Sequence, residues 1–156
     1  MKTEVPDTPA ELKARALRYL VRREHSRAEL ARKLAPHAES EQALAAVLDS
    51  LLAKKHQSDE RFAEERARSL SRKYGAARVR RDLEQRGVSA EISDRVSAGL
   101  NDLERARAIL QRKYREPAQT REERAKRARF LQSRGFSYDT IRSALALSSS
   151  TNFSEE

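Results

Sequence analysis

The sequence lacks cysteine and tryptophan and has only four glycines and four prolines among its 156 residues. Without cysteine it can form neither disulfides nor the thiolate sites that bind structural zinc. Aromatic residues make up only 5% of the chain, which favours several small cores over one thick core. The longest apolar runs are about four residues, far short of the ~20 that a membrane helix needs. No signal-peptide pattern is present either, so we expect a cytoplasmic protein with no membrane segment.

The chain is rich in charged residues, and most of them are basic. Charged residues make up 37% of it, and 33 Lys and Arg against 24 Asp and Glu give a net charge of +9. Residues 102–147 carry +6 of this charge. A net positive charge attracts polyanions, so nucleic acid or an acidic protein surface is the natural partner.

Helix signals run along the whole chain and predict an all-α protein. Residues 8–11 and 26–29 have the pattern of a capping box, which starts a helix. Between such starts and the next Gly or Pro, apolar residues recur every three or four positions. These signals predict nine helices, at residues 9–23, 27–35, 40–55, 58–74, 77–86, 90–99, 102–114, 121–134 and 138–147.

Three glycines stand at the predicted ends of helices. We expect Gly75, Gly87 and Gly135 each to take the left-handed conformation that ends a helix, which side chains disfavour. Ile92 follows Gly87 by five residues, whereas Ile141 follows Gly135 by six. We therefore expect the helices after these two glycines to pack in shifted registers.

The nine predicted helices form three triplets that resemble one another. Arg-Lys-Tyr at residues 72–74 recurs forty residues later, and residues 83–89 recur, with substitutions, forty-eight residues later. Repetition near this period indicates stacked helical units, each too small to bury its own apolar face. We predict a flexible tail at residues 1–8, three-helix repeats at 9–57, 58–101 and 102–147, and a flexible tail at 148–156.

No residues cluster in a pattern that suggests catalysis. The histidines His25, His37 and His56 stand apart, with no metal-binding spacing, and we expect them to be solvated or to cap loops. There is no Gly-rich phosphate loop, and the carboxylates alternate with arginines as intrahelical ion pairs require. We therefore expect no enzyme activity, no catalytic residue, no cofactor and no metal.

Basic side chains crowd two predicted helices and are the candidate binding residues. Arg78 and Arg81 are three residues apart and share a face, while Val79 and Leu83 point inward. Guanidinium groups bind phosphates and carboxylates bidentately, so DNA and acidic protein loops both fit, and a merely solvated helix face is the other interpretation. The candidate partner-binding or DNA-binding residues are Arg72, Lys73, Arg78, Arg81, Arg124, Arg127, Arg134 and Tyr138.

Five aromatic residues, Tyr74, Tyr114, Phe130, Phe136 and Tyr138, lie beside arginines in the sequence, as stacking on bases would require. Tyr74 and Tyr114, however, end apolar stripes, and Phe136 follows a helix-ending glycine. We therefore expect core or staple roles for four of them, and exposure for Tyr138.

Several segments occur in an order and spacing typical of one protein family. They include Ala-Leu-Arg-Tyr-Leu at 16–20, Ser-Arg-Ala-Glu-Leu at 26–30, Asp-Glu-Arg-Phe-Ala at 59–63 and, most specifically, Arg-Phe-Leu-Gln-Ser-Arg-Gly-Phe-Ser-Tyr-Asp-Thr-Ile at 129–141. Over residues 9–147 the chain thereby resembles the RecX family of regulators of the RecA recombinase.

The resemblance implies a fold of three tandem three-helix repeats, helix-turn-helix-like, in an elongated, curved body. It also implies binding to the RecA–DNA filament and inhibition or modulation of RecA recombinase, ATPase and coprotease activities in DNA repair, recombination and the SOS response. The expected partners are the RecA filament and, directly, single- and double-stranded DNA, with the protein itself a monomer. The alternatives are a DNA-binding protein that uses basic helix faces without RecA, and a scaffold for another acidic protein.

Overall fold

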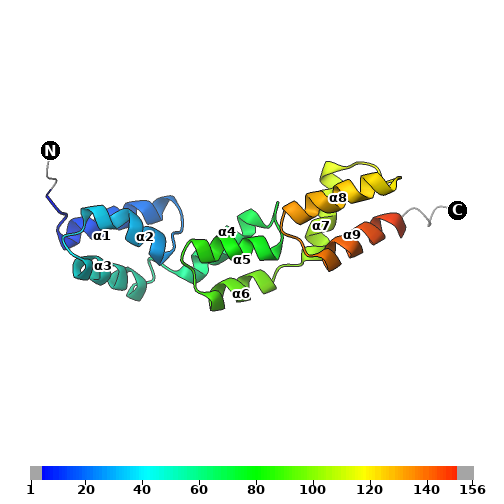
Figure 1. The fold of residues 1–156 in the computed structure, drawn as a ribbon. Coiled ribbons are helices and arrows are strands. Elements are labelled where there is room, and N and C mark those ends of the chain that lie inside the picture. Colours follow the sequence, from blue (N-terminus) through cyan, green and yellow to red (C-terminus); the bar gives the residue numbers. More distant parts are fainter. Residues whose placement is uncertain (1–4, 151–156) are drawn as a thin grey trace. The chain divides into compact units, whose positions relative to one another are not determined.

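The computed structural model describes residues 5–150, with side chains as far as residue 146. Over this range the chain forms nine α-helices and one 3₁₀ turn, and no strand (Figure 1). The all-α prediction is confirmed, and every predicted helix is present with ends within four residues of its expected bounds. The helices are α1 (Pro9–Arg22), α2 (Arg27–Leu34), α3 (Glu41–Ala53), α4 (Asp59–Leu70), α5 (Ala76–Gln85), α6 (Ala90–Ala98), α7 (Asp102–Lys113), α8 (Arg121–Ser133) and α9 (Tyr138–Ser150), with η1 (Ala35–His37) after α2.

Side-chain caps start several of these helices where the sequence predicts them. Thr8 caps α1, Ser40 caps α3 and Thr120 caps α8, each accepting a bond from a backbone N–H three residues on. At α2 the capping box is complete, because Ser26 Oγ accepts from the Glu29 N–H and the Glu29 carboxylate accepts from the Ser26 N–H. Local sequence alone therefore fixes where these helices begin.

The described chain divides into two compact units. Unit 1 contains residues 5–66 and 83–92, and unit 2 contains residues 67–82 and 93–150, so the helices of the second predicted repeat contribute to both. In unit 1, α1, α2 and α3 lie side by side (Figure 1). Their facing sides bury the core residues Leu12, Ala16, Leu30, Leu34, Val47, Leu48 and Leu51.

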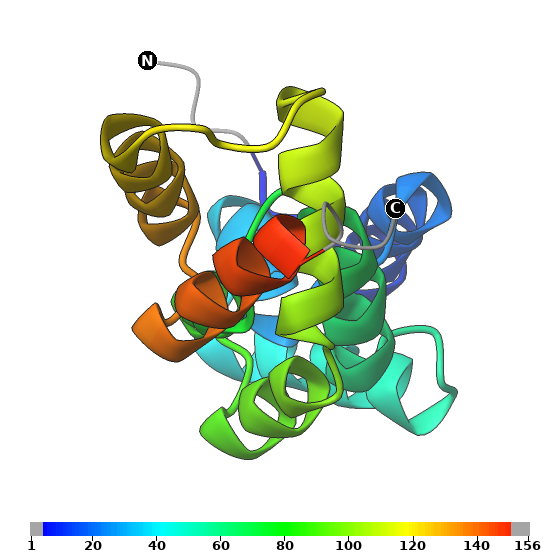
Figure 2. The same cartoon turned by 90° about the vertical axis from the view of Figure 1, so that its right-hand side faces the viewer.

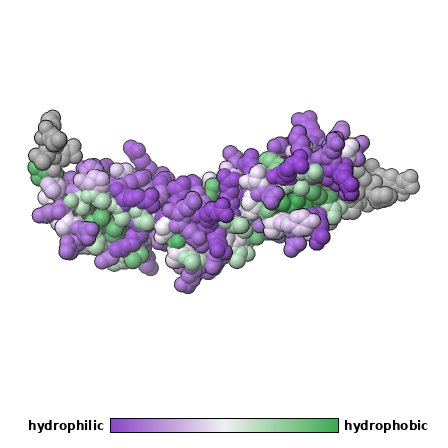
Figure 3. All heavy atoms as spheres, viewed as in Figure 1, coloured by the Kyte–Doolittle hydropathy of each residue, from purple (hydrophilic) through white to green (hydrophobic). Residues whose placement is uncertain are grey.

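Unit 2 has its own core. In Figure 2 α9 lies against α7, and it also packs against α8. The buried residues between these helices are Ala106, Ile109, Leu110, Leu131, Phe136, Ile141 and Ala144. In Figure 3 apolar atoms show between α8 and α9, while the outer faces of these helices are mostly hydrophilic. Each core is small, as the low aromatic content predicts.

A joint inside unit 1 ties the start of α2 to α4 and to the end of α5. The Ser26 hydroxyl donates to the Arg86 carbonyl at 2.6 Å, and the Arg27 N–H donates to Asp59 Oδ1 at 2.8 Å. Gly87, directly after α5, has φ +86° and packs on the first turn of α2. We call this set of contacts joint A.

A second joint of the same construction lies inside unit 2. The Gly75 N–H donates to the Arg134 carbonyl at 2.8 Å, and the Ala76 N–H donates to the Asp102 carboxylate at 3.1 Å. Gly135, directly after α8, has φ +87° and packs on the first turn of α5. We call this joint B. Joint B has the same kinds of contact as joint A. It connects the second and third predicted repeats, whereas joint A connects the first and second.

The left-handed conformation predicted for Gly87 and Gly135 is confirmed, but the prediction for Gly75 is wrong. Gly75 has no positive φ, and it precedes α5 instead of ending α4. A Cβ atom at this position would lie 2.4 Å from the Gly135 carbonyl oxygen. Glycine is needed here because two backbone segments approach closely, which the sequence pattern does not distinguish from a helix end.

The expected shift in register between α6 and α9 is also wrong. Each helix begins three residues after its glycine, and the sixth residue after the glycine is buried in both cases: Ser93 is 0% exposed and Ile141 is 5% exposed. Ile92, which the sequence comparison used, is only partly buried. The registers therefore agree, and a serine takes the core position that isoleucine takes in the following repeat.

Most of the two predicted tails, residues 1–4 and 151–156, lies outside the described residues. Within the predicted N-terminal tail, Asp7 is held by its neighbours: its N–H donates to the His37 carbonyl at 2.8 Å, and its carboxylate accepts from Arg15 Nε at 2.8 Å. The hydrogen bond from Arg15 lowers the pKa of Asp7. Residues 148–150 belong to α9.

Candidate binding surface

The turn between α4 and α5 is held by two arginines of α7. Arg105 Nη1 donates to the carbonyls of Ser71 at 3.1 Å and Tyr74 at 2.7 Å. Arg112 Nη2 donates to the Arg72 carbonyl at 2.8 Å. These bonds hold the carbonyls of the turn that follows α4, which ends at Leu70 and not at residue 74 as predicted. They also hold the Tyr74 backbone in place.

The Tyr74 ring carries two cations. The guanidinium carbon of Arg78 lies 4.1 Å from the ring centroid, and that of Arg134 lies 5.5 Å from it. Arg78 also donates to the Ser133 carbonyl at 2.9 Å. Both arginines therefore have defined positions although neither is buried.

The Phe130 ring continues this arrangement along α8. Arg134 lies 5.1 Å from the Phe130 centroid, and Lys113 Nζ lies only 3.6 Å from it. The Tyr114 ring meets Phe130 edge to face, at 6.5 Å and 82°. Arg127 covers Tyr114 at 4.3 Å and donates to the Glu116 carbonyl at 2.8 Å.

Cations and rings thus alternate along one surface of unit 2, which we call the cation–ring ladder. Its members, in order, are Arg78, Tyr74, Arg134, Phe130, Lys113, Tyr114 and Arg127. Each contact contributes about 0.5–1 kcal/mol at exposed sites. The larger effect is on order, because a long cationic side chain placed over a ring has less rotamer entropy to lose when it binds a partner.

The partners of the cations in the ladder are uncharged, so the positive charge of the ladder is not neutralised. Its four cations contact rings and backbone carbonyls, and none forms an ion pair with a carboxylate in the part of the chain that the structure describes. Guanidinium and ammonium groups in this state keep their attraction for oxyanions. The arrangement is able to bind phosphates or carboxylates, and it has no group suited to bond cleavage.

Three of the eight predicted binding residues belong to the ladder: Arg78, Arg127 and Arg134. Arg72 and Lys73 are exposed on the turn before α5. Tyr138 is 73% exposed, as predicted, with Arg142 near its ring at 5.4 Å. Arg81 and Arg124 are exposed but outside the ladder.

Lys113 and three aromatic rings are the members that the sequence did not identify. Tyr74, Tyr114 and Phe130 were expected in core or staple roles. Tyr114 and Phe130 do pack against the core of unit 2, but all three are only partly buried and each also carries cations on its ring. Phe136, at 4% exposed, is a core residue as predicted. The recurrence of Arg-Lys-Tyr at 72–74 and 112–114 was the available signal, since both tyrosines end up under cations.

His25 and Glu29 form a buried polar cluster at joint A. His25 is 1% exposed and therefore not solvated, but its Nδ1 lies 3.0 Å from the Arg23 carbonyl in the loop after α1, which agrees with the predicted loop-capping role. Burial lowers its pKa. Burial raises the pKa of the Glu29 carboxyl, but hydrogen bonds from Arg23 and Ser26 outweigh it, and the net effect is a lowered pKa.

Two classes of site are absent from residues 5–150. No group of three or more His, Asp or Glu side chains there is placed to hold a metal ion. No helix of this range has the length and apolar character to cross a membrane.

Known proteins resemble this chain over most of its length. Three family models, described as the first, second and third three-helix domains of RecX, match residues 13–51, 58–96 and 101–145. The regulatory protein RecX of Leptothrix cholodnii is 44% identical over 138 residues, which cover 87% of this chain and 88% of that protein. The regulatory protein RecX of Herbaspirillum seropedicae is 44% identical over 142 residues, or 90% and 92% of the two chains.

A solved structure is similar in fold. The crystal structure of RecX from Lactobacillus salivarius matches with a TM-score of 0.79 at 20% identity, over 90% of this chain and 96% of that one. Together with the family matches, it confirms the prediction of three-helix repeats.

Proposed function

This chain belongs to the RecX family of regulatory proteins, and we propose that it binds the RecA–DNA filament and restrains the ATPase, recombinase and coprotease activities of RecA. The family is one of regulators and not of enzymes. The observation that carries the proposal is the cation–ring ladder of unit 2, whose charge is ordered and not neutralised.

The ladder suits a polymeric, anionic partner. A filament of protein on DNA presents phosphates and acidic side chains repeatedly, and a row of ordered cations can engage several of them together. Contacts that are individually weak then combine into stable binding, because each further contact forms within one complex. A small isolated anion would use only one or two of these cations.

Binding across neighbouring RecA subunits would restrain the filament in three ways. It would obstruct the addition of subunits, slow ATP turnover in the subunits that it bridges, and cover the surface on which cleavable repressors dock. None of these effects needs a catalytic group on the regulator, in agreement with the absence of bond-cleaving groups in the ladder.

The test is the ATPase activity of RecA on single-stranded DNA, titrated with the wild type and with Lys113→Glu. Lys113 contacts only ring faces, so its reversal changes the charge of the ladder without removing a hydrogen bond. We expect the wild type to inhibit at micromolar concentration and Lys113→Glu to need roughly tenfold more protein, a loss of about 1.4 kcal/mol.

The matched control is Lys126→Glu, the same charge change at an exposed position of α8 outside the ladder. It should inhibit nearly as well as the wild type. If the wild type leaves both ATPase activity and strand exchange unchanged at micromolar excess, the proposed function is wrong. If both variants lose the same amount, net charge and not the ladder is responsible.

A further inference from the structure

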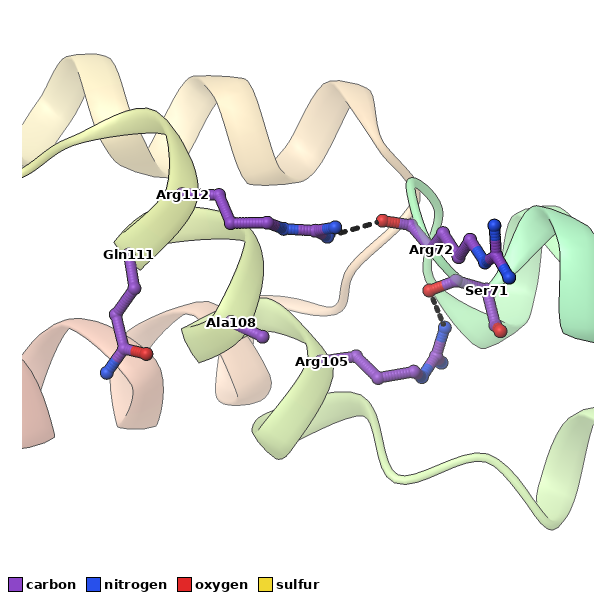
Figure 4. A pocket seen from close by; sticks show the side chains of 6 residues that line it. All are labelled: Ser71, Arg72, Arg105, Ala108, Gln111 and Arg112. Carbon is purple, nitrogen blue, oxygen red and sulfur yellow. Dashed lines mark hydrogen bonds between the residues drawn. The ribbon is translucent and has the colours of Figure 1, made fainter.

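A cavity in unit 2, next to the turn between α4 and α5, is a second cationic feature. Its volume is about 510 Å³, and it is open to solvent (Figure 4). The residues that line it are Ser71, Arg72, Arg105, Ala108, Gln111 and Arg112. Three arginines line this cavity and no carboxylate does, although Arg105 also pairs with Asp102.

Arg105, one of the lining residues, has a buried donor without an acceptor. Its Nη atoms bond to backbone carbonyls and to Asp102, but its Nε is buried and has no hydrogen-bond partner among the described residues. A buried donor without an acceptor costs about 1–3 kcal/mol. Burial also lowers the pKa of Arg105, which shows that its charged form is poorly solvated. Asp102 opposes this effect of burial, and an oxyanion in the cavity would stabilise the charge of the guanidinium further.

Two further lining residues have free donors. The guanidinium of Arg72 and the amide of Gln111 are exposed, and neither has a partner in the range 5–150. Figure 4 shows Arg105 and Arg112 extending from α7 towards the turn at Ser71 and Arg72, with Gln111 on the same helix. Arg112 uses one of its donors on the Arg72 carbonyl and has others to offer.

We propose that this cavity binds a phosphate of a nucleic-acid backbone, with Arg72, Arg105 and Arg112 as its cationic donors. The inference rests on the proposed function, which brings DNA to this surface, and it names the contact made there. A single phosphate leaves part of the cavity for its sugar, since sites for small molecules occupy about 300–1,000 Å³. The cavity and the ladder both include residues of the turn at 71–74.

An acidic peptide fits the cavity less well. One carboxylate offers two oxygens in a plane and fills little of the volume, so the donors spread over three arginines and Gln111 would remain partly unused. A phosphodiester presents oxygens in several directions and continues into a neighbouring phosphate. The nucleic acid is therefore the partner that the donor geometry favours.

The experiment measures binding of the full-length protein to fluorescent oligonucleotides by anisotropy, without RecA, over a series of salt concentrations. The probes are a single-stranded oligothymidine and a duplex of equal length. Gln111→Glu places a negative charge in the cavity without removing any intramolecular bond. Gln42→Glu, at an exposed position of α3, is its matched control with the same change in net charge.

We expect Gln111→Glu to weaken binding about tenfold and Gln42→Glu to weaken it less than twofold, with the same helix content by circular dichroism. Arg72→Gln should reduce the slope of log affinity against log salt by about 0.7 on the single strand or about 0.9 on the duplex, as one phosphate contact requires. The probe with the larger effect of Gln111→Glu identifies the strand form that the cavity binds.

Two outcomes would overturn the inference: equal binding by Gln111→Glu and Gln42→Glu, or binding of a polyglutamate peptide at this cavity with no binding of either oligonucleotide. The second result would assign the cavity to an acidic protein segment. Since RecA is absent from the assay, neither result decides the proposed function, which depends on the ATPase titration.

Discussion

Gly87 and Ala28 approach so closely in joint A that a Cβ atom at Gly87 would lie 2.2 Å from the Ala28 Cβ atom. Gly87 also has φ +86°, a conformation in which a side chain is strained. Ala28 lies in the first predicted repeat and Gly87 in the second, so this backbone-to-side-chain contact joins the two repeats.

Gly87→Ala should lower the free energy of unfolding by about 2–4 kcal/mol, because backbone strain and overpacking act together. Urea denaturation followed by circular dichroism measures this. Gly99→Ala is the control, since the nearest atom to its Cβ would be 3.6 Å away and its φ is not positive. Its stability should be unchanged or slightly higher, and equal losses in both variants would contradict the role of joint A.

Glu29→Gln should destabilise unit 1 by about 2 kcal/mol. The Glu29 carboxylate is 9% exposed and binds Arg23 at 2.9 Å and Arg86 at 3.3 Å. Glutamine keeps an oxygen for the Ser26 N–H but removes the charge that both arginines need. The loss is smaller than for a fully buried pair, because the arginines are partly exposed.

Asp49→Asn is the matched control for Glu29→Gln, measured by the same denaturation. Asp49 pairs with Arg27 at 2.7 Å, a shorter distance, but its side chain is 69% exposed. We expect a loss below about 0.5 kcal/mol. If Asp49→Asn proved as harmful as Glu29→Gln, burial would not be what gives the Glu29 pairs their strength.

Ser93→Ala should raise the free energy of unfolding by about 1 kcal/mol. The Ser93 hydroxyl is buried at 0% exposure and has no hydrogen-bond partner among the described residues, so its removal ends a desolvation penalty. Thermal denaturation suffices to detect the change. Ser97→Ala is the comparison, because the buried Ser97 hydroxyl donates to the Asp94 carbonyl at 3.1 Å, and its loss should bring no gain.

The stability of the protein should fall as pH decreases below about 6.5, because of His25. Lys33 can only donate, so the His25 Nε2 at 2.8 Å from its ammonium accepts, and the ring proton lies on Nδ1 and donates to the Arg23 carbonyl. These two hydrogen bonds favour the neutral form of the His25 ring. With its folded pKa lowered, the unfolded chain binds the proton first, and stability is lost between the unfolded pKa and the folded one.

Denaturation at pH 7.5 and 5.5 measures this effect, and His25→Gln should remove most of the difference between the two pH values. Glu29 acts in a separate window, because its lowered pKa gives stability that is lost only below its ordinary value of about 4.5. A wild type equally stable at pH 7.5 and 5.5 would contradict the lowered pKa of His25, because the folded chain would then bind the proton as readily as the unfolded chain.

The positions of the helices could be predicted because their causes are local. Ser26 and Thr120 cap helices through atoms three residues away, and Leu30 and Leu34 recur on one face. The turn after α4 could not be predicted in this way, because the side chain that binds its carbonyls, Arg105, lies more than thirty residues later. Gly75 was misassigned because the backbone that it approaches closely, at Gly135, is also distant in the sequence.

The sequence predicted several cations of the candidate site but not the role of its aromatic rings. The sequence shows that Arg127 and Arg134 are candidate cations, whereas the contact of Lys113 with Phe130 depends on how α7 and α8 pack. Partly buried rings satisfy the apolar pattern on one side and bind cations on the other, so periodicity alone assigns them to the core.

Joints A and B both have a direction. In each, main-chain or hydroxyl donors at the start of a second helix, such as the amides of Gly75 and Ala76, find their acceptors in the repeat that follows. Truncation from the C-terminal side would therefore leave amide hydrogens without acceptors, whereas truncation from the N-terminal side would leave carbonyls such as that of Arg86 without donors. Water can replace the lost partner in either case, because the face of the joint becomes exposed and the first amides of a helix have no partner within the helix. A shortened form therefore loses the hydrogen bonds that connect one repeat to the next, without leaving a buried amide unpaired.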